Sequence, residues 1–559
     1  MRRLLHAFAL STLAFAFAEA HAATITVINL DGAGEGFNDP TPAAPVGGNP
    51  GTTVGAQRLF VFQYAADVWA NLLPSPVVIR IGANFDPQSC TATTGVLGSA
   101  GPETVHRDFP NAPFSGTWYH QALANRLAGS DLAPSNDDIG ITFNSSVGGA
   151  NCLPAGWYYG VDGNEGSQIE LLPVVLHEMG HGLGFSTTTD GQTGTLMGGF
   201  PGAYDHFLFD DTANKHWTEM TSGEIAASAI NCANVVWDGH SVTANAATYL
   251  GPKPLLRVNT PAGLAGDYPV GQASFGPSLS TSGLSSDVVL AVDGVGLPNN
   301  ACEPLTNAGA MAGKIALLDR GGCAFTVKVK NAQDAGAIAA IVADSLPGCP
   351  PGAMGGTDPT ITIPSVRVTQ DLGNQLKSAL ASGLNVTLIL DPSQHAGTDA
   401  VGRVLVFTPN PYQGGSSVSH WDTSANPDLL MEPALSPSLS QSVDLTLNHF
   451  IDIGWIAEST SAENTPSPGT TLGVLSSNPT RGTTTIGFSL PRDEDVNLAV
   501  FDLRGRLVTG LVVGSQTAGN HTVQWSGKDL FGREMPSGVY LCQLRTRTAR
   551  MSEHLVLVH

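Results

Sequence analysis

The sequence predicts a multidomain protein that combines an α+β domain, a β-rich α/β domain and a C-terminal β-sandwich. Three observations support this fold class. The chain has 559 residues, which is too many for a single hydrophobic core. Residues 24–250 mix helical and strand-like periodicity, whereas residues 478–559 alternate apolar and polar positions between frequent turn signals. The 65 glycines and 37 prolines favour many turns and short strands over long helices.

The N-terminus has the features of a secretory signal peptide. Met1 to Arg3 precede an apolar run from Leu4 to Phe17, and small residues follow around Ala20. We therefore interpret residues 1–22 as a signal peptide and expect a protein that is secreted or displayed at the cell surface. This run is too short to span a bilayer, and we expect no membrane span elsewhere because no later segment reaches about 18 consecutive apolar residues.

The charge balance bears on which partners the protein has. The chain carries 47 acidic and 25 basic residues, a formal net charge of −22. An acidic surface of this kind argues against nucleic acids and anionic membranes as partners.

Seven cysteines are spread widely through the chain, and export allows them to form disulfides. Because seven is an odd number, at least one thiol stays unpaired. Proximity within the expected domains favours the pairs Cys90–Cys152 and Cys302–Cys323. The close CxxC spacing of structural zinc sites does not occur.

The segment before residue 250 reads as an α+β domain. A strand pattern at residues 24–28 is followed by a Gly/Pro/Asn-rich loop and by a helical pattern at residues 56–69. Further strand patterns occupy residues 77–81 and 139–143. The mixture of helix and strand ahead of the histidine motif described next predicts an α+β catalytic domain.

A metal-binding motif, His177-Glu178-Met179-Gly180-His181, follows an apolar run that Pro173 begins. On a helix the two histidines are four residues apart, so both imidazoles project from one face and can bind one zinc ion. Glu178 lies beside them, where it can act as the general base on a zinc-bound water. Gly180 leaves space inside the helix, and Gly184 allows a sharp turn after it.

The third zinc ligand is not supplied locally. A catalytic zinc site needs three protein ligands and one open position. In the extended pattern HExxHxxGxxH the third histidine would stand at position 187, but that residue is Thr187. The candidates that remain are Asp205 or His206, a glutamate such as Glu219 or Glu224, and His420 within Ser419-His420-Trp421-Asp422.

The HExxHxxGF motif at 177–185, the Ser-His-Trp-acidic segment at 419–422 and Leu430-Met431 together resemble the leishmanolysin-type metzincin peptidases. This resemblance implies that His420 is the third ligand of Zn²⁺, that Met431 is the Met-turn residue beneath the metal, and that residues 444–455 close the catalytic domain. The cysteine-bearing propeptide of the family is not evident, since no cysteine precedes Cys90.

The long insertion before His420 has a signature of its own. Residues 313–325 read as a buried strand and a Gly turn, residues 328–333 as an amphipathic helix, and residues 335–344 as a second buried strand. This pattern resembles the protease-associated (PA) domain, with limits near 255 and 402. The resemblance implies a non-catalytic module, in which Asp319, Arg320 and Lys328 are structural. If His181 and His420 bind one zinc ion, both ends of the insertion return to the cleft, and we expect the module to restrict or guide substrate.

The C-terminal region divides into a linker and a small domain. Residues 458–477 are rich in Ser, Thr, Pro and Gly and read as a linker, and residues 478–559 read as a β-sandwich. The latter resembles immunoglobulin-like C-terminal modules, close to type IX sorting domains, which implies secretion machinery or the cell surface as a partner. The catalytic domain then comprises residues 23–254 and 403–457.

The sequence therefore predicts a secreted zinc-dependent endopeptidase that acts on protein or peptide substrates. Zinc bound by His177, His181 and His420 would activate water, with Glu178 as general base. Two other function classes stay open: a zinc hydrolase that acts on a non-protein substrate, and a surface binding or adhesion protein with a vestigial zinc site.

Overall fold

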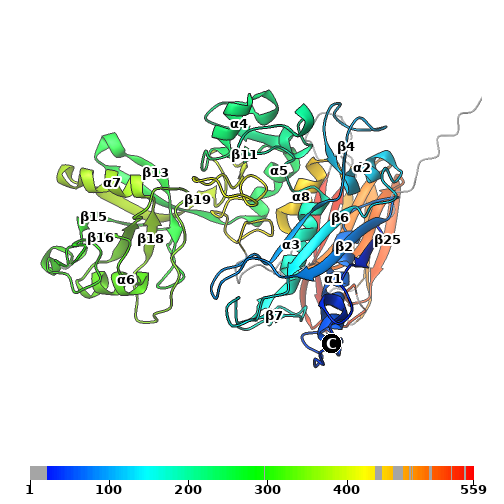
Figure 1. Cartoon of the computed structure of the whole chain (residues 1–559), viewed down its shortest axis with the longest axis horizontal. Helices are drawn as coiled ribbons and strands as arrows, with labels where there is room; N and C mark the ends of the chain where they lie inside the picture. Colours follow the sequence, from blue (N-terminus) through cyan, green and yellow to red (C-terminus); the bar gives the residue numbers. More distant parts are fainter. Residues whose placement is uncertain are drawn as a thin grey trace, which may run out of the picture.

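The structure is a computed structural model, and it describes residues 22–294, 296–434, 443–456, 470–476, 480, 482–502, 507–530, 532–546 and 549–558. The predicted signal peptide, apart from Ala22, and most of the predicted linker lie outside the described residues. Figure 1 shows the inserted domain at one end of the molecule and the C-terminal strands beside the N-terminal sheet at the other. Among the described residues, no helix is both long and apolar enough to cross a membrane.

The N-terminal sheet has the strand order β1-β2-β6-β3, in which β3 is an antiparallel edge strand and the other three run parallel. Helices α1 and α3 pack against each other, and α3 also lies along β3 and β6. The predicted strands and helix are confirmed to within a few residues. The bounds are β1 Ile25–Asn29, α1 Val54–Ala70, β2 Ile79–Asp86, β3 Gly98–Pro102, β6 Ile139–Asn144 and α3 Leu171–Leu183.

Helix α3 is buried along its whole length, which fits its almost continuous apolar sequence. Gly182 allows it to approach the sheet, because a Cβ at this position would lie 2.2 Å from Cγ2 of Ile139. The helix ends at Gly184, whose φ of 130° is a conformation that favours glycine. The sharp turn predicted at Gly184 is thus confirmed, whereas the close packing at Gly182 was not predicted.

A second sheet shows that this domain is discontinuous in sequence. Its order is β10-β9-β11-β20, and β20, which follows the insertion, pairs with β11, which precedes it. The remaining helices include α8, whose start agrees with the segment predicted to close the domain. The bounds are β4 Val105–His106, β5 Tyr119–His120, α2 Gln121–Ala128, β7 Trp157–Tyr158, β8 Ile169–Glu170, β9 Leu208–Asp210, β10 Lys215–His216, α4 Ser222–Ser228, β11 Val235–Trp237, α5 His240–Tyr249, β20 Val404–Leu405 and α8 Asp444–Asp452.

The inserted domain is built on an eight-stranded mixed sheet. Its predicted strand, helix and strand are β16, α6 and β17. Its first and last strands are neighbours, with Pro252 opposite His395, so the chain enters and leaves side by side. The sheet therefore begins three residues before the predicted limit at 255. The bounds are β12 Pro252–Thr260, β13 Gly266–Pro269, β14 Gly271–Gln272, β15 Leu284–Leu290, β16 Ile315–Asp319, α6 Phe325–Asp334, β17 Ala339–Ala343, β18 Ser365–Val368, α7 Gln370–Ala379 and β19 Asn385–His395.

The charged residues that the sequence singled out in this domain all bond within it. Asp319 pairs with Lys377, and Arg320 pairs with Asp344. The buried ammonium of Lys328 donates to the carbonyls of Asn300 and Gly321 at 2.6 and 2.5 Å. These contacts agree with structural roles.

The C-terminal strands form two sheets, β21-β22-β25 and β24-β23-β26-β27, with one shared core. Strand β21 lies inside the range predicted as linker, so the linker limit at 477 was wrong. Its short Thr/Gly-containing sequence resembles a linker, and its strand conformation comes from pairing with β22. The bounds are β21 Thr471–Val474, β22 Thr484–Leu490, β23 Glu494–Asp502, β24 Leu507–Gln516, β25 Gly519–Trp525, β26 Gly538–Thr546 and β27 Arg550–Leu557.

Three disulfides link the described cysteines. The predicted pairs Cys90–Cys152 and Cys302–Cys323 are confirmed. The third, Cys232–Cys349, joins the α+β domain to the inserted domain and was not predicted. Cys542 is a buried free thiol, so one cysteine is left over as expected.

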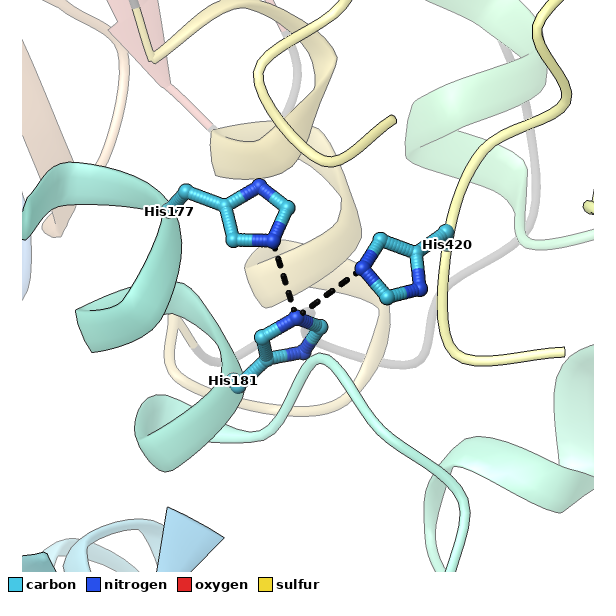
Figure 2. Close-up of side chains that lie close together, drawn as sticks. All are labelled: His177, His181 and His420. Carbon is cyan, nitrogen blue, oxygen red and sulfur yellow. Dashed lines mark hydrogen bonds between the residues drawn. The ribbon is translucent and has the colours of Figure 1, made fainter. Parts of the chain in front are cut away.

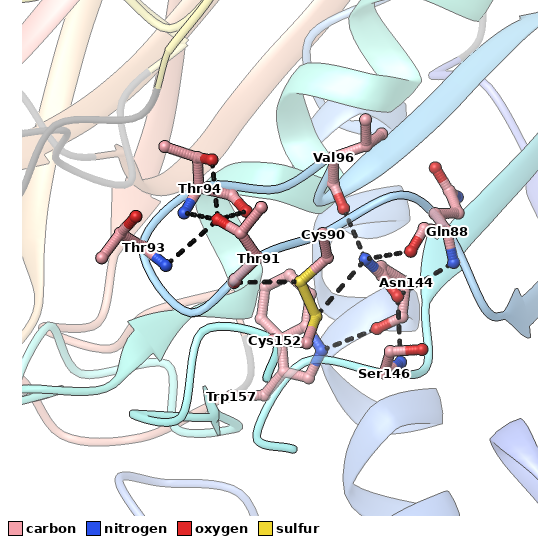
Figure 3. Close-up of a disulfide and its surroundings, with 10 residues drawn as sticks. All are labelled: Gln88, Cys90, Thr91, Thr93, Thr94, Val96, Asn144, Ser146, Cys152 and Trp157. Atoms are coloured by element: carbon pink, nitrogen blue, oxygen red, sulfur yellow. Dashed lines mark hydrogen bonds between the residues drawn. A yellow bond between two sulfur atoms is a disulfide. The ribbon is translucent and has the colours of Figure 1, made fainter. Parts of the chain in front are cut away.

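The Cys90–Cys152 disulfide lies beside Asn144, a fully buried residue at the end of β6 (Figure 3). The Asn144 side chain accepts from the backbone N–H groups of Gln88 and Ser146 at 3.1 and 2.9 Å and donates to the carbonyl of Val96 at 2.8 Å. Together the disulfide and the amide fix the loop that leads into the edge strand β3.

We expect Asn144→Ala to lower the free energy of unfolding by about 1–3 kcal/mol, because it leaves partly buried backbone groups without partners. Chemical denaturation measures this loss. Asn164→Ala is the control, since that exposed side chain bonds only to Asp162 among the described residues. Equal stabilities of the two variants would contradict the proposed anchoring.

Candidate metal centre

Three imidazole rings converge at one point in the α+β domain (Figure 2). His177 and His181 project from one face of α3, and His420 comes from the loop that follows the insertion. Nε2 of His181 lies 3.0 Å from Nε2 of His177 and 3.2 Å from Nε2 of His420. All three side chains are buried.

Backbone carbonyl groups fix the orientation of each ring. Nδ1 of His177 is 2.7 Å from the carbonyl oxygen of Leu430, Nδ1 of His181 is 2.8 Å from that of Phe185, and Nδ1 of His420 is 2.7 Å from that of Ser416. A carbonyl oxygen only accepts, so each Nδ1 carries the proton and each neutral ring presents the lone pair of Nε2 to the centre.

This donor set fits a zinc ion. Zn–N bonds of about 2.0–2.1 Å in a tetrahedral site place two ligand nitrogens roughly 3.3 Å apart. This separation is close to the 3.0 and 3.2 Å from Nε2 of His181 to Nε2 of His177 and of His420. Lone pairs that face one another repel, and a cation would remove that repulsion. Burial lowers the pKa of His177 to about 4 and that of His420 to about 3, which keeps both rings neutral. Burial, and then the two neighbouring histidines, hold the pKa of His181 well below its usual range.

The other candidates for a third ligand are engaged elsewhere. Asp205 accepts hydrogen bonds from Thr187 and Thr189 at 2.5 and 2.6 Å, and His206 stacks on Phe114. Glu219 bonds to the backbone of His216, and Glu224 caps α4 and pairs with Lys215. The described residues contain one cluster of potential metal-ligand side chains, and its members are His177, His181 and His420.

Glu178 lies between the two histidines of α3 and is buried. Its carboxyl group faces the edge strand, since a Cβ at Gly98 would be 3.0 Å from its Cγ and Oε1 atoms. Burial raises the pKa of Glu178 to about 8.

Met431 packs against α3 beside Gly180. A Cβ at Gly180 would lie 2.7 Å from its sulfur atom, which explains why the motif tolerates a glycine inside a helix. Met431 is fully buried, and its carbonyl oxygen accepts a hydrogen bond from the backbone of Trp421, next to His420.

Several groups that support the site were not predicted. The buried carboxylate of Asp444 accepts from the N–H of Leu430 at 2.6 Å and so holds the residue whose carbonyl orients His177. An acidic residue at a helix start was its only signal in the sequence. His449 of α8 is buried among aromatic rings, 4.3 Å from Phe185 and from Trp237 between ring centroids. The carbonyl groups of Leu430, Phe185 and Ser416, which orient the three rings, belong to the backbone, so no sequence pattern predicts them.

Comparison with known proteins identifies two of the domains. Residues 284–376 match the PA domain family, and residues 475–549 match the FlgD Ig-like domain family. The chain is thus a multidomain protein that contains a PA domain and a C-terminal Ig-like domain.

Individual relatives match over short segments. Leucine aminopeptidase 2 of Trichophyton equinum is 38% identical over 91 residues, which is 16% of this chain and 18% of that protein. Vacuolar-sorting receptor 2 of Arabidopsis thaliana is 31% identical over 172 residues, which is 28% of this chain and 27% of the receptor. The chain therefore spans less than a third of the length of either relative.

Solved structures give similarly partial matches. An aminopeptidase from Aneurinibacillus sp. strain AM-1 is 20% identical, with a TM-score of 0.20, and the match covers 27% of this chain and 37% of the enzyme. FlgD from P. aeruginosa is 31% identical, with a TM-score of 0.12, over 13% of this chain and 60% of FlgD.

The contact between Gly180 and Met431 predicts coupled mutations. Gly180→Val should overpack the site and lower the free energy of unfolding by about 1–3 kcal/mol, and Met431→Ala should lower it by about 2–5 kcal/mol. The double variant should lose clearly less than the sum, because each change relieves the other. Denaturation of the metal-free proteins measures the three values.

A second double-mutant cycle, made with Gly223→Val and Met431→Ala, serves as the control. Gly223 lies in the helix α4, and a Cβ there would meet no atom within 4 Å. The effects of these two substitutions should add. Additivity in the Gly180 cycle as well would show that Met431 does not pack against this helix.

Proposed function

We propose that this protein is a secreted zinc-dependent endopeptidase whose metal ligands are His177, His181 and His420. The observation that carries the proposal is the convergence of three neutral imidazoles, with each Nδ1 held by a carbonyl group and each Nε2 directed at the others. Three histidines with a fourth position left for water or substrate form a typical catalytic zinc site.

The residues have separate roles in the proposed reaction. A bound zinc ion would lower the pKa of water and polarise the scissile carbonyl group. Glu178 in its carboxylate form, which a cation nearby would favour, accepts the proton of the attacking water and later delivers it to the leaving amine. Its buried position beside Gly98 supports this role, because the carboxyl group packs against β3 and is kept away from bulk water.

Strand β3 supports a peptide as the substrate. It is the edge strand of the N-terminal sheet, and it begins at Gly98, in contact distance of Glu178. An extended peptide can add to an exposed edge by backbone hydrogen bonds, which would bring a scissile bond next to the carboxylate. This placement favours peptide hydrolysis over the alternative of a non-protein substrate.

We also propose that the protein is a leishmanolysin-type metzincin and that it is exported and attached through its C-terminal domain. The leishmanolysin-type metzincin class rests on the motif, on His420 and on Met431 beneath the helix. Export and attachment through the C-terminal domain rest on the N-terminal sequence and on the Ig-like domain. The relatives that match are an aminopeptidase and a sorting receptor, so they support a shared module rather than a shared reaction. A vestigial site is disfavoured because binding alone gives no reason for a buried Glu178.

We expect Glu178→Gln to lower peptidase turnover by about 10²–10⁴-fold while one zinc ion per chain is retained, because the change removes the base and no ligand. Hydrolysis of a fluorogenic peptide and metal analysis of the same samples measure both. Glu303→Gln, which changes an exposed glutamate of the PA domain, is the control. Full turnover in Glu178→Gln would exclude its role as base.

The PA domain is proposed to control access of substrate to the cleft. Because Pro252 and His395 are opposite each other, residues 253–394 can be replaced by a short linker, with Cys232→Ser to avoid a free thiol. We expect this deletion to change kcat/KM for a folded protein substrate much more than for a short peptide. Equal changes for both substrates would contradict a gating role.

A further inference from the structure

The segment that leads to His420 lies between loops of two different domains. On one side, the N–H of Val406 donates to the carbonyl of Val235 at 2.9 Å, and the hydroxyl of Thr408 donates to the carbonyl of Asn231 at 3.2 Å. Both donors belong to this segment and are fully buried. The α+β domain therefore holds one side of the segment.

The PA domain holds the other side. Cys349 and Asn410 exchange two backbone hydrogen bonds of 3.2 and 3.1 Å. Cys349 also forms the disulfide with Cys232, which is next to Asn231 in the chain. The covalent bond thus connects the two flanking loops, and the segment that leads to His420 is bonded to both of them.

The stretch from Val406 to Asn410, which these bonds hold on both sides, is directly connected to His420. Phe407 donates its N–H to the carbonyl of His420 at 2.9 Å, and its carbonyl accepts from the N–H of Val418 at 2.7 Å. Phe407 precedes Thr408, whose hydroxyl bonds to the loop that carries Cys232. A shift of the stretch from Val406 to Asn410 would therefore move the backbone of His420.

We propose that the Cys232–Cys349 disulfide is a positioning device for the metal site: it holds the PA loop against the α+β domain and so fixes the backbone of His420. The inference rests on the proposed metal site. The two sulfur atoms do not bind the metal, and the disulfide acts through the stretch between Val406 and Asn410. The inserted domain then contributes to metal affinity even though none of its residues is a ligand.

A disulfide also stabilises a fold by restricting the unfolded chain, so stability alone does not test this proposal. The chain supplies a matched control in Cys302–Cys323, a disulfide within the PA domain. The experiment compares the full mature protein with Cys232→Ser/Cys349→Ser and with Cys302→Ser/Cys323→Ser. Zinc affinity is measured by competition with a fluorescent chelator, at a temperature at which all three proteins are folded. The visible spectrum of the Co²⁺ form reports the ligand geometry.

We expect Cys232→Ser/Cys349→Ser to bind zinc about tenfold more weakly or worse, the usual loss when a group that orients a metal ligand is removed, and to change the Co²⁺ spectrum. Cys302→Ser/Cys323→Ser should keep the parental affinity within about twofold and the parental spectrum. Thr408→Val keeps both disulfides and loosens the same stretch, so it should weaken zinc binding by about two- to tenfold, the loss of one hydrogen bond. This variant serves as the test if the first double variant does not fold.

The results separate this inference from the proposed function. Parental zinc affinity in Cys232→Ser/Cys349→Ser, or in Thr408→Val where that double variant does not fold, overturns the inference and leaves the metal site intact. An equal loss in the two double-serine variants also overturns it, because the effect would then reflect general loosening of the PA domain. A parent protein that binds no zinc overturns the proposed function and this inference with it.

Discussion

The convergence of three imidazole nitrogens is the constraint on which the rest of the structure depends. Nε2 of His181 and Nε2 of His420 lie 3.2 Å apart although 239 residues separate them in the chain. Neutral lone pairs at such distances repel, so their positions must be imposed by the surrounding protein. The carbonyl groups of Leu430, Phe185 and Ser416 do this by fixing each ring through its Nδ1 proton.

The close packing of α3 follows from the same constraint. The helix must be rigid and close to its neighbours if both of its histidines are to keep one orientation. Gly182 allows contact with the sheet, and Gly180 makes room for Met431. Each glycine lowers helix propensity by about 1 kcal/mol relative to alanine, and the close packing it allows offsets that loss. Asp444 extends the support outward, because it holds Leu430.

A whole domain is inserted between His181 and His420, and two features of the structure still bring these residues together. Strands β12 and β19 are neighbours, so the chain returns to where it left, and β20 then pairs with β11 of the interrupted domain. The disulfide between Cys232 and Cys349 adds a covalent connection away from these strands. The three histidines proposed to bind zinc and the PA domain are thus connected by hydrogen bonds and by a disulfide.

Much of the architecture could be predicted because it depends on local patterns. The HExxH helix follows from its apolar run and its spacing of four residues, and the PA strands β16 and β17 from continuous apolar residues. His420 could be chosen only through a family resemblance, since no periodicity connects it to α3. Contacts between domains were missed for the same reason: Cys232 and Cys349 are 117 residues apart. Strand β21 and the two-residue strands β10 and β20 are too short to show an alternation, and pairing with neighbours defines them.

The most direct test of this account is the zinc content of the purified mature protein compared with that of His420→Ala, with His521→Ala in the Ig-like domain as a control. The account predicts one zinc ion per chain in the parent and in His521→Ala, and a strong loss in His420→Ala, because two histidines cannot complete the site. Unchanged zinc in His420→Ala would contradict the split site and would require a different third ligand.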